Sequence, residues 1–382
     1  MPIRLEEVYN KALPDYQIKL IAGEGGLRNH VEWVHVIEDE QVSGFLRGNE
    51  LVFTTGIGHV GSSWLNIFVP RLKEHGACGL VVNLGRHIME LPAEVISFCR
   101  EAEFPLFTIP WEVRIVDMSR YICHMIVEKE QTEISVSNAF RNAIFFPDQR
   151  EIYEPQLERF GYRFSRGYCV AAVSIRAKSA QKQEAALESL ISQTQRMFSC
   201  LDEKYSIFVQ DDHLLIVFVD FQDELIRHLL EKFQANFTDG RVSIGVSDSC
   251  QNLGLLAKCY KQALAALDIS EKKHVNIVCY RDMGVYKLLL QVDDKEALHN
   301  AYYDILGKLD DYDRLNATDY VKTLRCYLEQ SGSVQAVADM TYVHRNTVNY
   351  KLRKIKEIIG LELIDTEERM WIWLALKIKD IL

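Results

Sequence analysis

The chain of 382 residues is long enough for two or three domains, each with its own buried core. Hydrophobic residues make up 48% of it and charged residues 26%, and 44 Lys and Arg against 54 Asp and Glu leave a net charge of −10. These values exclude a disordered chain, a collagen-like repeat, a small disulfide scaffold and an overall basic coat for nucleic acid, although a local basic element remains open.

The start of the chain and its cysteines favour a cytoplasmic location. The N-terminus turns acidic at Glu6 and Glu7 and lacks the apolar core of a secretory signal. No run approaches the ~18 apolar residues that a membrane helix needs. The nine cysteines never form C-x-x-C, which is typical of reduced core cysteines. Since no metal-ligand spacing stands out either, we expect no metal and no cofactor.

Residues 1–125 alternate short apolar runs with helical patterns. Strands are predicted at 51–55, 79–84 and 105–109, and helices at 63–75 and 93–103. A strand–helix–strand–helix–strand series implies parallel strands with helical crossovers. The sequence therefore predicts a parallel α/β domain.

The turns after these three strands are the predicted site for a small ligand, because ligands of such sheets bind beyond the carboxyl ends of the strands. Two of the turns contain glycine, one contains an arginine and one a tryptophan, a combination that suits a small polar or anionic molecule. The candidate effector-binding residues are Thr55, Gly56, Asn83, Arg86 and Trp111. The alternative is that the glycines only make turns and Trp111 caps the core.

A long helical pattern follows this domain. Residues 118–131 continue into 133–143 without glycine or proline until Pro147. The apolar spacing is not regular enough over several heptads to predict a coiled coil. We expect a linker helix within 126–160, and its pairing with a second copy, altered when the N-terminal domain binds its ligand, is a hypothesis.

Residues 161–283 form a second α/β block. In chain order, a strand at 168–175 precedes a polar helix reaching Met197, a hairpin of strands 205–209 and 213–219, a helix at 223–233, a strand at 241–246, an alanine-rich helix at 253–267 and a strand at 275–280. This order, with Val242-Ser243-Ile244-Gly245-Val246 before the alanine-rich helix, resembles the GGDEF cyclase-like domain.

Two requirements of an active cyclase are missing from this block. Carboxylates at the end of the first strand would hold Mg²⁺, and a glycine pair in the hairpin would admit the nucleotide. Residues 170–175 contain no carboxylate and are followed by Arg176, and residues 209–213 contain no glycine. We therefore expect a degenerate, non-catalytic domain and no enzyme activity.

The last hundred residues are predicted to be helical. After an acidic stretch, Asn316 or Thr318 can cap a helix that reaches about Gln330. Ser331-Gly332 ends it, and Ser333 can cap a short helix through Asp339. A turn at 340–343 leads into a long helix at 344–359, ended by Gly360. A short helix, a turn and a longer helix form the layout of a helix-turn-helix.

The long helix has one apolar and one basic face. At about 100° per residue, Val348, Leu352, Ile355 and Ile359 fall within roughly 60° and form a buried stripe. From Thr341 to Gly360 there are five basic residues and one acidic residue, whereas an ordinary solvated face mixes the two signs. Asparagine and arginine can read base edges, and lysine suits phosphates. The predicted DNA-binding residues are Arg345, Asn346, Thr347, Asn349, Tyr350, Lys351, Arg353 and Lys354.

The run from Val343 to Ile355, followed by Gly360-Leu361, resembles the C-terminal helix-turn-helix of PucR-type (purine catabolism regulator-like) transcription factors. Runs at 21–27, 33–36, 46–51 and 54–56, together with 105–107 and 110–112, resemble the N-terminal domain of that family. The resemblance covers nearly the whole chain, in the family's order. Asn349 departs from it, because many members are expected to carry a basic residue there, which bears on the operator sequence.

The resemblance implies a multidomain α/β and all-α protein. The expected domains are an N-terminal effector-sensing domain (1–125), a linker helix (126–160), a degenerate GGDEF-like domain (161–283) and a helix-turn-helix domain (284–382). It implies a bacterial regulator of catabolic genes, purine or related, that binds promoter DNA as a homodimer or higher homo-oligomer under control of a small metabolite. The effector, the operator and the choice between activation and repression stay open. The rival interpretations are an oligomeric scaffold without DNA binding and a nucleotide cyclase-like enzyme.

Overall fold

The computed structural model describes residues 3–177, 179–198, 201, 204–237, 240–362 and 365–382. The chain packs as two compact units, one made of Met1–Asn142, Gln149–Tyr162 and Ser189–Ser206, the other of Ala143–Asp148, Arg163–Glu188 and Ile207–Leu382. Within the described ranges, no helix combines the length and the apolar character needed to cross a membrane. The division into four sequence domains stays a prediction.

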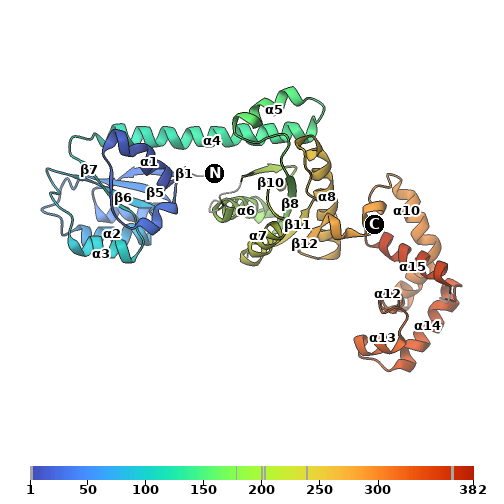
Figure 1. Ribbon diagram of the computed structural model, residues 1–382. Helices are drawn as coiled ribbons and strands as arrows, with labels where there is room; N and C mark the ends of the chain where they lie inside the picture. The colour runs from blue at the N-terminus through green and yellow to red at the C-terminus, as the bar shows by residue number, and fades with distance from the viewer. Residues whose placement is uncertain (1–2, 178, 199–200, 202–203, 238–239, 363–364) are drawn as a thin grey trace. The chain divides into compact units, whose positions relative to one another are not determined.

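The first unit contains a five-stranded sheet in the order β2-β7-β6-β5-β4 (Figure 1). Its strands and those of a small pair are β1 (Ile3–Arg4), β2 (Lys19–Ala22), β3 (His30–Val31), β4 (Trp33–Val36), β5 (Glu50–Thr54), β6 (Gly79–Leu84) and β7 (Leu106–Pro110). Its helices are α1 (Leu5–Tyr16), α2 (Leu65–Glu74) and α3 (Ala93–Glu101), with short turns η1 (Glu24–Arg28) and η2 (Glu40–Phe45).

The pairing of β5, β6 and β7 confirms the parallel arrangement that the sequence predicts. Leu51 pairs with Gly79 and Val81 with Phe107, both in parallel register, whereas β2 joins the sheet antiparallel to β7. One face packs against α1 and the start of α4 (Ile115–Phe145) through Val81 and Met118, and the other against α2 and α3 through Phe68. These two apolar layers fix the strands whose ends carry the predicted effector residues.

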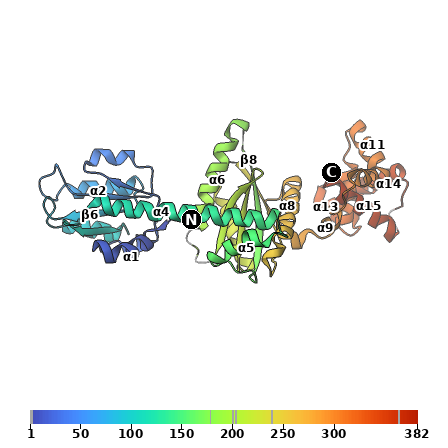
Figure 2. The same cartoon turned by 90° about the horizontal axis from the view of Figure 1, so that it is seen from above.

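The linker region is helical, as expected. α4 is one continuous helix of 31 residues, and α5 (Arg150–Arg159) follows a break that contains Pro147 (Figure 2). Met118, Ile122, Met125 and Ile126 of α4 are buried against the first sheet. The helix therefore begins as part of the N-terminal core.

The second unit contains a five-stranded sheet in the order β12-β11-β8-β10-β9. The elements of this block are β8 (Tyr168–Ala177), η3 (Ala180–Lys182), α6 (Gln183–Phe198), β9 (Tyr205–Gln210), β10 (His213–Val219), α7 (Asp223–Asn236), β11 (Gly240–Val246), η4 (Leu253–Leu255), α8 (Leu256–Lys273) and β12 (Ile277–Cys279). The predicted hairpin turns at Asp211 and Asp212, whose φ angles of 48° and 63° are those of a tight two-residue turn. The element order that the sequence predicts is confirmed.

Gly245 lets α8 lie directly on β11. A Cβ atom at this position would lie 2.1 Å from the carbonyl oxygen of Ala263 and 2.2 Å from the backbone nitrogen of Leu267. Ala263 and Ala266 are fully buried on the facing side of α8. Small residues on both elements therefore bring the helix and strand backbones into contact.

The rest of the second unit is helical. Its elements are η5 (Tyr280–Met283), α9 (Tyr286–Leu289), α10 (Lys295–Tyr302), a π-helical turn η6 (Tyr303–Gly307), α11 (Lys308–Asn316), α12 (Tyr320–Glu329), α13 (Val334–Thr341), α14 (Arg345–Ile359) and α15 (Thr366–Lys379). One apolar cluster runs from Ile269 of α8 through Met283 and Tyr286 to Leu324, Val348 and Leu376. The helical part thus shares a core with the end of α8.

Candidate nucleic-acid interface

Helix α12 opens the helix-turn-helix, and its cap differs from the prediction. The carboxylate of Asp313 accepts hydrogen bonds from the backbone N–H groups of Tyr320 and Val321, both at 2.8 Å, and from the Thr318 hydroxyl at 2.5 Å. The expected cap at Asn316 or Thr318 is therefore wrong. A charged acceptor seven residues upstream holds the first turn, and Thr318 only supports it.

The break and the second helix follow the prediction. Ser331 and Gly332 both take positive φ angles, 52° and 83°, which end α12. The Ser333 hydroxyl then accepts the N–H of Ala336 at 3.2 Å and caps α13. The turn comes later than expected, because α13 runs to Thr341 and the chain reverses at Tyr342, with φ at 54°.

Helix α14 begins and ends as predicted. Nδ1 of His344 accepts the backbone N–H of Asn346 at 3.2 Å, and Gly360, with φ at 73°, ends the helix. Val348, Leu352 and Ile355 are buried, Val348 to 1% exposure, and pack into the core shared with α12 and α15. Ile359 is only half-buried. The apolar stripe therefore turns the opposite face of α14 to solvent.

That opposite face carries polar side chains that are free to contact a partner. Arg345, Asn346, Asn349 and Arg353 are exposed, and their side chains make no hydrogen bond or ion pair with any described residue. The Arg353 guanidinium lies 5.7 Å from the ring centre of Tyr350, which is 49% exposed. Arg345, Asn349 and Arg353 are spaced by four residues and so form one row along the helix.

The lysines of the predicted set are placed differently. Lys351 lies 2.5 Å from a carboxylate oxygen of Asp319, and Lys354 lies 2.6 Å from one of Glu357. Lys356, just outside the set, pairs with Glu362 at 3.4 Å. Thr347 is exposed at the start of the helix. Of the five cations on α14, the two arginines are thus the ones without a carboxylate partner in the described part of the chain.

Two residues beside this face were not predicted. Tyr342 is 96% exposed in the turn, and the exposed His344 caps the helix start. The unpaired N–H groups of a helix N-terminus attract phosphate, so both residues lie where a nucleic-acid backbone would approach. Their position in the turn before the predicted long helix could have indicated that they lie beside the DNA-facing side.

The predicted effector turns meet at the carboxyl ends of the first sheet. A Cβ at Gly56 would lie 2.7 Å from Ile88 Cγ1, and one at Gly85 would lie 2.5 Å from Trp111 Cβ. The turn after β6 therefore contacts both the turn after β5 and the turn after β7. Arg86 is exposed and Trp111 is 40% exposed. The structure therefore brings these turns together.

Three of the five predicted effector positions are already hydrogen-bonded within the protein. The Glu38 carboxylate accepts hydrogen bonds from Thr55 N–H at 2.9 Å, from the Thr55 hydroxyl at 2.7 Å and from Gly56 N–H at 2.8 Å. Asn83 is 3% exposed and donates to the Val113 carbonyl at 3.1 Å, while its Oδ1 has no partner among the described residues. Arg86 and Trp111 are thus the accessible members of the set.

In the middle block, the structure places the predicted first strand and hairpin as the sequence indicates. Val170 to Ile175 lie inside β8 without a carboxylate, and the hairpin turn is formed by Asp211 and Asp212. The described residues contain no group of three or more side chains that could hold a metal ion.

Three family models match the chain in the order of these blocks. The purine catabolism regulatory protein-like family (PucR) matches residues 8–126, the GGDEF-like domain residues 147–269 and the PucR C-terminal helix-turn-helix domain residues 320–378. The fold class predicted from the sequence is thereby confirmed.

Curated relatives are transcriptional regulators. The DNA-binding transcriptional activator AdeR of Bacillus subtilis is 24% identical over 56% of this chain and 51% of its own length. The proline-responsive transcriptional activator PutR of the same organism is 23% identical over 65% of this chain and 62% of its own. The B. subtilis purine catabolism regulatory protein is 30% identical over 39% and 29%. The chain thus matches less than two thirds of the length of each relative.

A crystal structure of a regulator of polyketide synthase expression from Bifidobacterium adolescentis aligns with 63% of this chain and 95% of its own, at 17% identity and a TM-score of 0.31. That likeness is too low to support an argument, whereas the three domain matches and the named relatives agree with each other. The chain therefore contains a domain of the purine catabolism regulatory protein-like family, a GGDEF-like domain and the PucR C-terminal helix-turn-helix domain, in this order, and its curated relatives are transcriptional regulators.

Proposed function

We propose that this chain is a sequence-specific DNA-binding regulator of catabolic genes, purine or related, and not an enzyme. The observation that carries the proposal is the exposed face of α14, where the side chains of Arg345, Asn346, Asn349 and Arg353 make no hydrogen bond or ion pair with the residues that the structure describes. Arginine pairs with guanine and asparagine with adenine through two hydrogen bonds each in the major groove. The residues that we propose to contact DNA are Arg345, Asn346, Thr347, Asn349, Tyr350, Lys351, Arg353 and Lys354.

Within that set the ion pairs suggest a division of roles. Arg345 and Arg353 can contact DNA without losing a carboxylate, whereas Lys351 and Lys354 must first leave Asp319 and Glu357. We expect the two arginines and the two asparagines to read bases, and the lysines to approach phosphates only when those ion pairs open.

The test is a fluorescence-anisotropy titration on the promoter DNA beside the protein's own gene. Arg353→Ala removes a contact worth about 1–3 kcal/mol and should weaken binding about 5- to 150-fold. Arg314→Ala is the matched control, because it removes the same charge from the exposed α11 side chain that pairs with Asp311. Equal binding by the natural chain and the Arg353 variant would contradict the proposal.

The salt dependence of the same titration tests the role of the lysines. If only the two arginines of each protomer in a dimer neutralise phosphates, about four counterions are released and the slope of log K against log salt is about −4. If all five cations of α14 engage, the slope approaches about −9. A slope near zero for the promoter DNA would exclude the proposed interface.

We propose that a small metabolite controls the protein from the N-terminal domain. The supporting observation is the meeting of the three strand-end turns, with exposed Arg86 and Trp111 beside Thr55, Gly56 and Asn83. The test is quenching of tryptophan fluorescence by a panel of purine catabolites and carboxylate metabolites. The quenching should be lost in Trp111→Phe and weakened in Arg86→Ala, and a panel member that acts equally on all three chains would bind elsewhere.

The remaining partners follow from promoter binding. Helix-turn-helix proteins commonly bind paired half-sites, so we propose a homodimer or higher homo-oligomer in the cytoplasm, where promoter DNA is accessible. Two relatives are named activators, which favours activation over repression. Sedimentation of the full chain at two concentrations tests the oligomer.

A further inference from the structure

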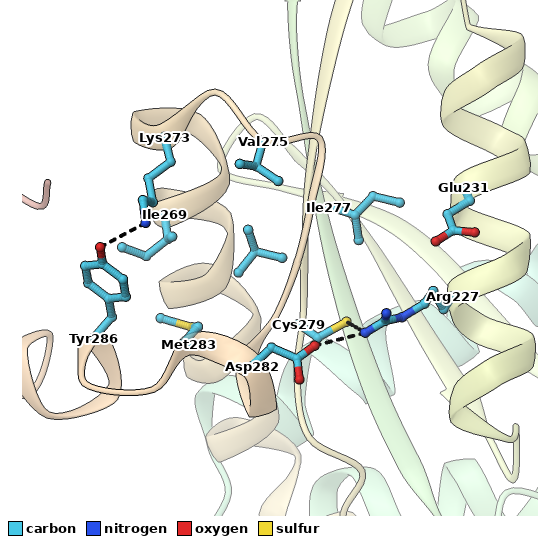
Figure 3. Close-up of a pocket in the computed structure, with 11 residues that line it drawn as sticks. Arg227, Glu231, Ile269, Lys273, Val275, Ile277, Cys279, Asp282, Met283 and Tyr286 are labelled. Atoms are coloured by element: carbon cyan, nitrogen blue, oxygen red, sulfur yellow. Dashed lines mark hydrogen bonds and ion pairs between the residues drawn. The ribbon is translucent and has the colours of Figure 1, made fainter. Parts of the chain in front are cut away.

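A cavity of about 300 Å³ lies in the second unit, where the middle sheet meets the first of the C-terminal helices (Figure 3). The end of α8 and the short α9 form one wall, and α7 contributes two residues on the opposite side. Ile269, Val278 and Met283 supply apolar lining, and Ile269 and Met283 are themselves buried. The cavity is of a size that suits a small metabolite.

One end of the cavity has more cations than anions. Lys273 donates to the Tyr286 hydroxyl at 2.9 Å, and that hydroxyl donates to Asp380 at 2.5 Å. Asp380 also accepts two hydrogen bonds from Arg325, at 2.8 and 3.1 Å, and Lys273 lies 3.7 Å from it. Lys377 also lies over this phenol ring, 5.6 Å from its centre. Two cations therefore contact one carboxylate, and a third lies beside the same tyrosine.

Lys377 responds to the charges around it. Burial lowers the pKa of Lys377, and the positive charges of Lys273 and Arg325 lower it further, while Asp380 and Glu329 act in the opposite direction. Since three cations face two carboxylates even when Glu329 is counted, a further anion at the Lys273 end would be stabilised.

At the opposite end of the cavity, the positive charge is already paired with a carboxylate. Arg227 is already paired with Asp282 at 2.9 Å and lies 3.6 Å from the Cys279 sulfur. Glu231, one turn further along α7, is exposed and has no partner among the described residues. This end is therefore negative overall and would repel a second carboxylate.

From this asymmetry we propose that the cavity binds a small amphipathic monocarboxylate. Its carboxylate lies at Lys273 beside Tyr286, and its apolar chain lies against Ile269, Val278 and Met283. This is a second ligand site, separate from the strand-end turns of the N-terminal domain.

The site is placed to influence the helix-turn-helix. Arg325 belongs to α12 and Asp380 follows α15, so the Tyr286–Asp380–Arg325 contacts join the cavity wall to the frame that holds α14. A carboxylate that draws Lys273 away from Asp380 changes the charge balance at that joint. The binding itself does not depend on DNA recognition and is tested without DNA.

The experiment is isothermal titration of the full chain with hexanoate, hexylamine, hexanol and adipate. Hexanoate is expected to bind saturably, and the other three about tenfold more weakly or not at all, because only hexanoate combines one carboxylate with an apolar chain. Hexylamine or hexanol binding as tightly as hexanoate would overturn the proposal.

Variants locate the site. Lys273→Gln should weaken hexanoate about tenfold. The matched control Lys258→Gln, which removes the same charge from an exposed position on the same helix, should not change it. Glu231→Lys replaces an exposed side chain and should make adipate bind at least as tightly as hexanoate. Unchanged hexanoate affinity in Lys273→Gln, or an unchanged preference in Glu231→Lys, would each refute the assigned orientation.

Discussion

The carboxylate of Asp313 holds the start of α12, so replacing it tests how the helix-turn-helix is assembled. Asp313→Ala removes the acceptor of two backbone N–H groups and of the Thr318 hydroxyl. Loss of an N-cap acceptor costs about 0.5–2 kcal/mol, and here two N–H groups lose their partner together. We expect the local stability of α12 to fall by about 2 kcal/mol.

The assay is hydrogen–deuterium exchange of peptides from Tyr320–Glu329, because a chain of two units need not unfold in one step. A loss of about 2 kcal/mol corresponds to roughly 30-fold faster exchange when exchange follows local opening. Asp313→Asn keeps one oxygen as acceptor and should accelerate exchange only about fivefold, close to 1 kcal/mol.

Asp311→Ala is the matched control, because among the described residues that carboxylate accepts hydrogen bonds from the side chains of Tyr303 and Arg314 and from no backbone N–H of α12. It should leave the exchange of α12 unchanged. Exchange in Asp313→Ala within twofold of the natural chain would refute the argument, since the first turn would then be held by something other than this carboxylate.

Three other features give predictions of their own. Gly245→Ala should lower the stability of the middle domain by about 1–3 kcal/mol, and with it the thermal midpoint, because the new methyl group would clash with the Ala263 carbonyl oxygen. An unchanged midpoint would mean that α8 can shift away from β11. A hydrogen bond from Cys259 lowers the pKa of Cys250 despite burial, so iodoacetamide should alkylate Cys250 with a midpoint below the ordinary thiol pKa of about 8.5, and a midpoint above that pH in peptide mapping would contradict this. Burial raises the pKa of Asp380, but hydrogen bonds from Arg325 and Tyr286 outweigh it and hold the pKa below its usual value. Its charge therefore stabilises the fold above about pH 4, and this contribution is lost as the pH falls further. Asp380→Asn should unfold at a lower temperature at pH 7 and show a smaller change in midpoint between pH 5 and pH 3.

The central strands could be predicted from the sequence because they are buried on both faces. The predicted bounds of β6 match the structure residue for residue, since Gly79–Leu84 is an apolar run interrupted by Asn83 and bounded by turn residues. β2 and β4 were missed, because each has only four residues and half-exposed side chains at the two outer positions of the sheet. The helix α15 was covered only by the general prediction of a helical C-terminal part and was not delimited, although Ile372 and Leu376 belong to the same core as α14.

The candidate interface was predictable in outline for a similar reason. The period of Val348, Leu352 and Ile355 fixes which face of α14 is buried and, by exclusion, which face is free. The sequence does not predict which cations on this face form ion pairs, because the partner of Lys351 is Asp319, which lies 32 residues earlier, just before α12. The same limit applies to Asp380, whose contacts with Tyr286 and Arg325 span 94 and 55 residues.

These ion pairs also explain how an acidic protein can carry a basic helix. The net charge of −10 opposes general attraction to DNA, and Asp319, Glu357 and Glu362 neutralise three of the five cations on α14. Non-specific binding depends on the number of phosphates that cations can neutralise, so the paired lysines contribute little to it. Among the described residues Arg345 and Arg353 have no carboxylate partner, and arginine forms paired hydrogen bonds to guanine as well as to phosphate. If α14 binds DNA as proposed, the carboxylates would shift its balance from general attraction towards base recognition, because they neutralise the lysines, which suit phosphates, and leave the arginines, which can also read bases.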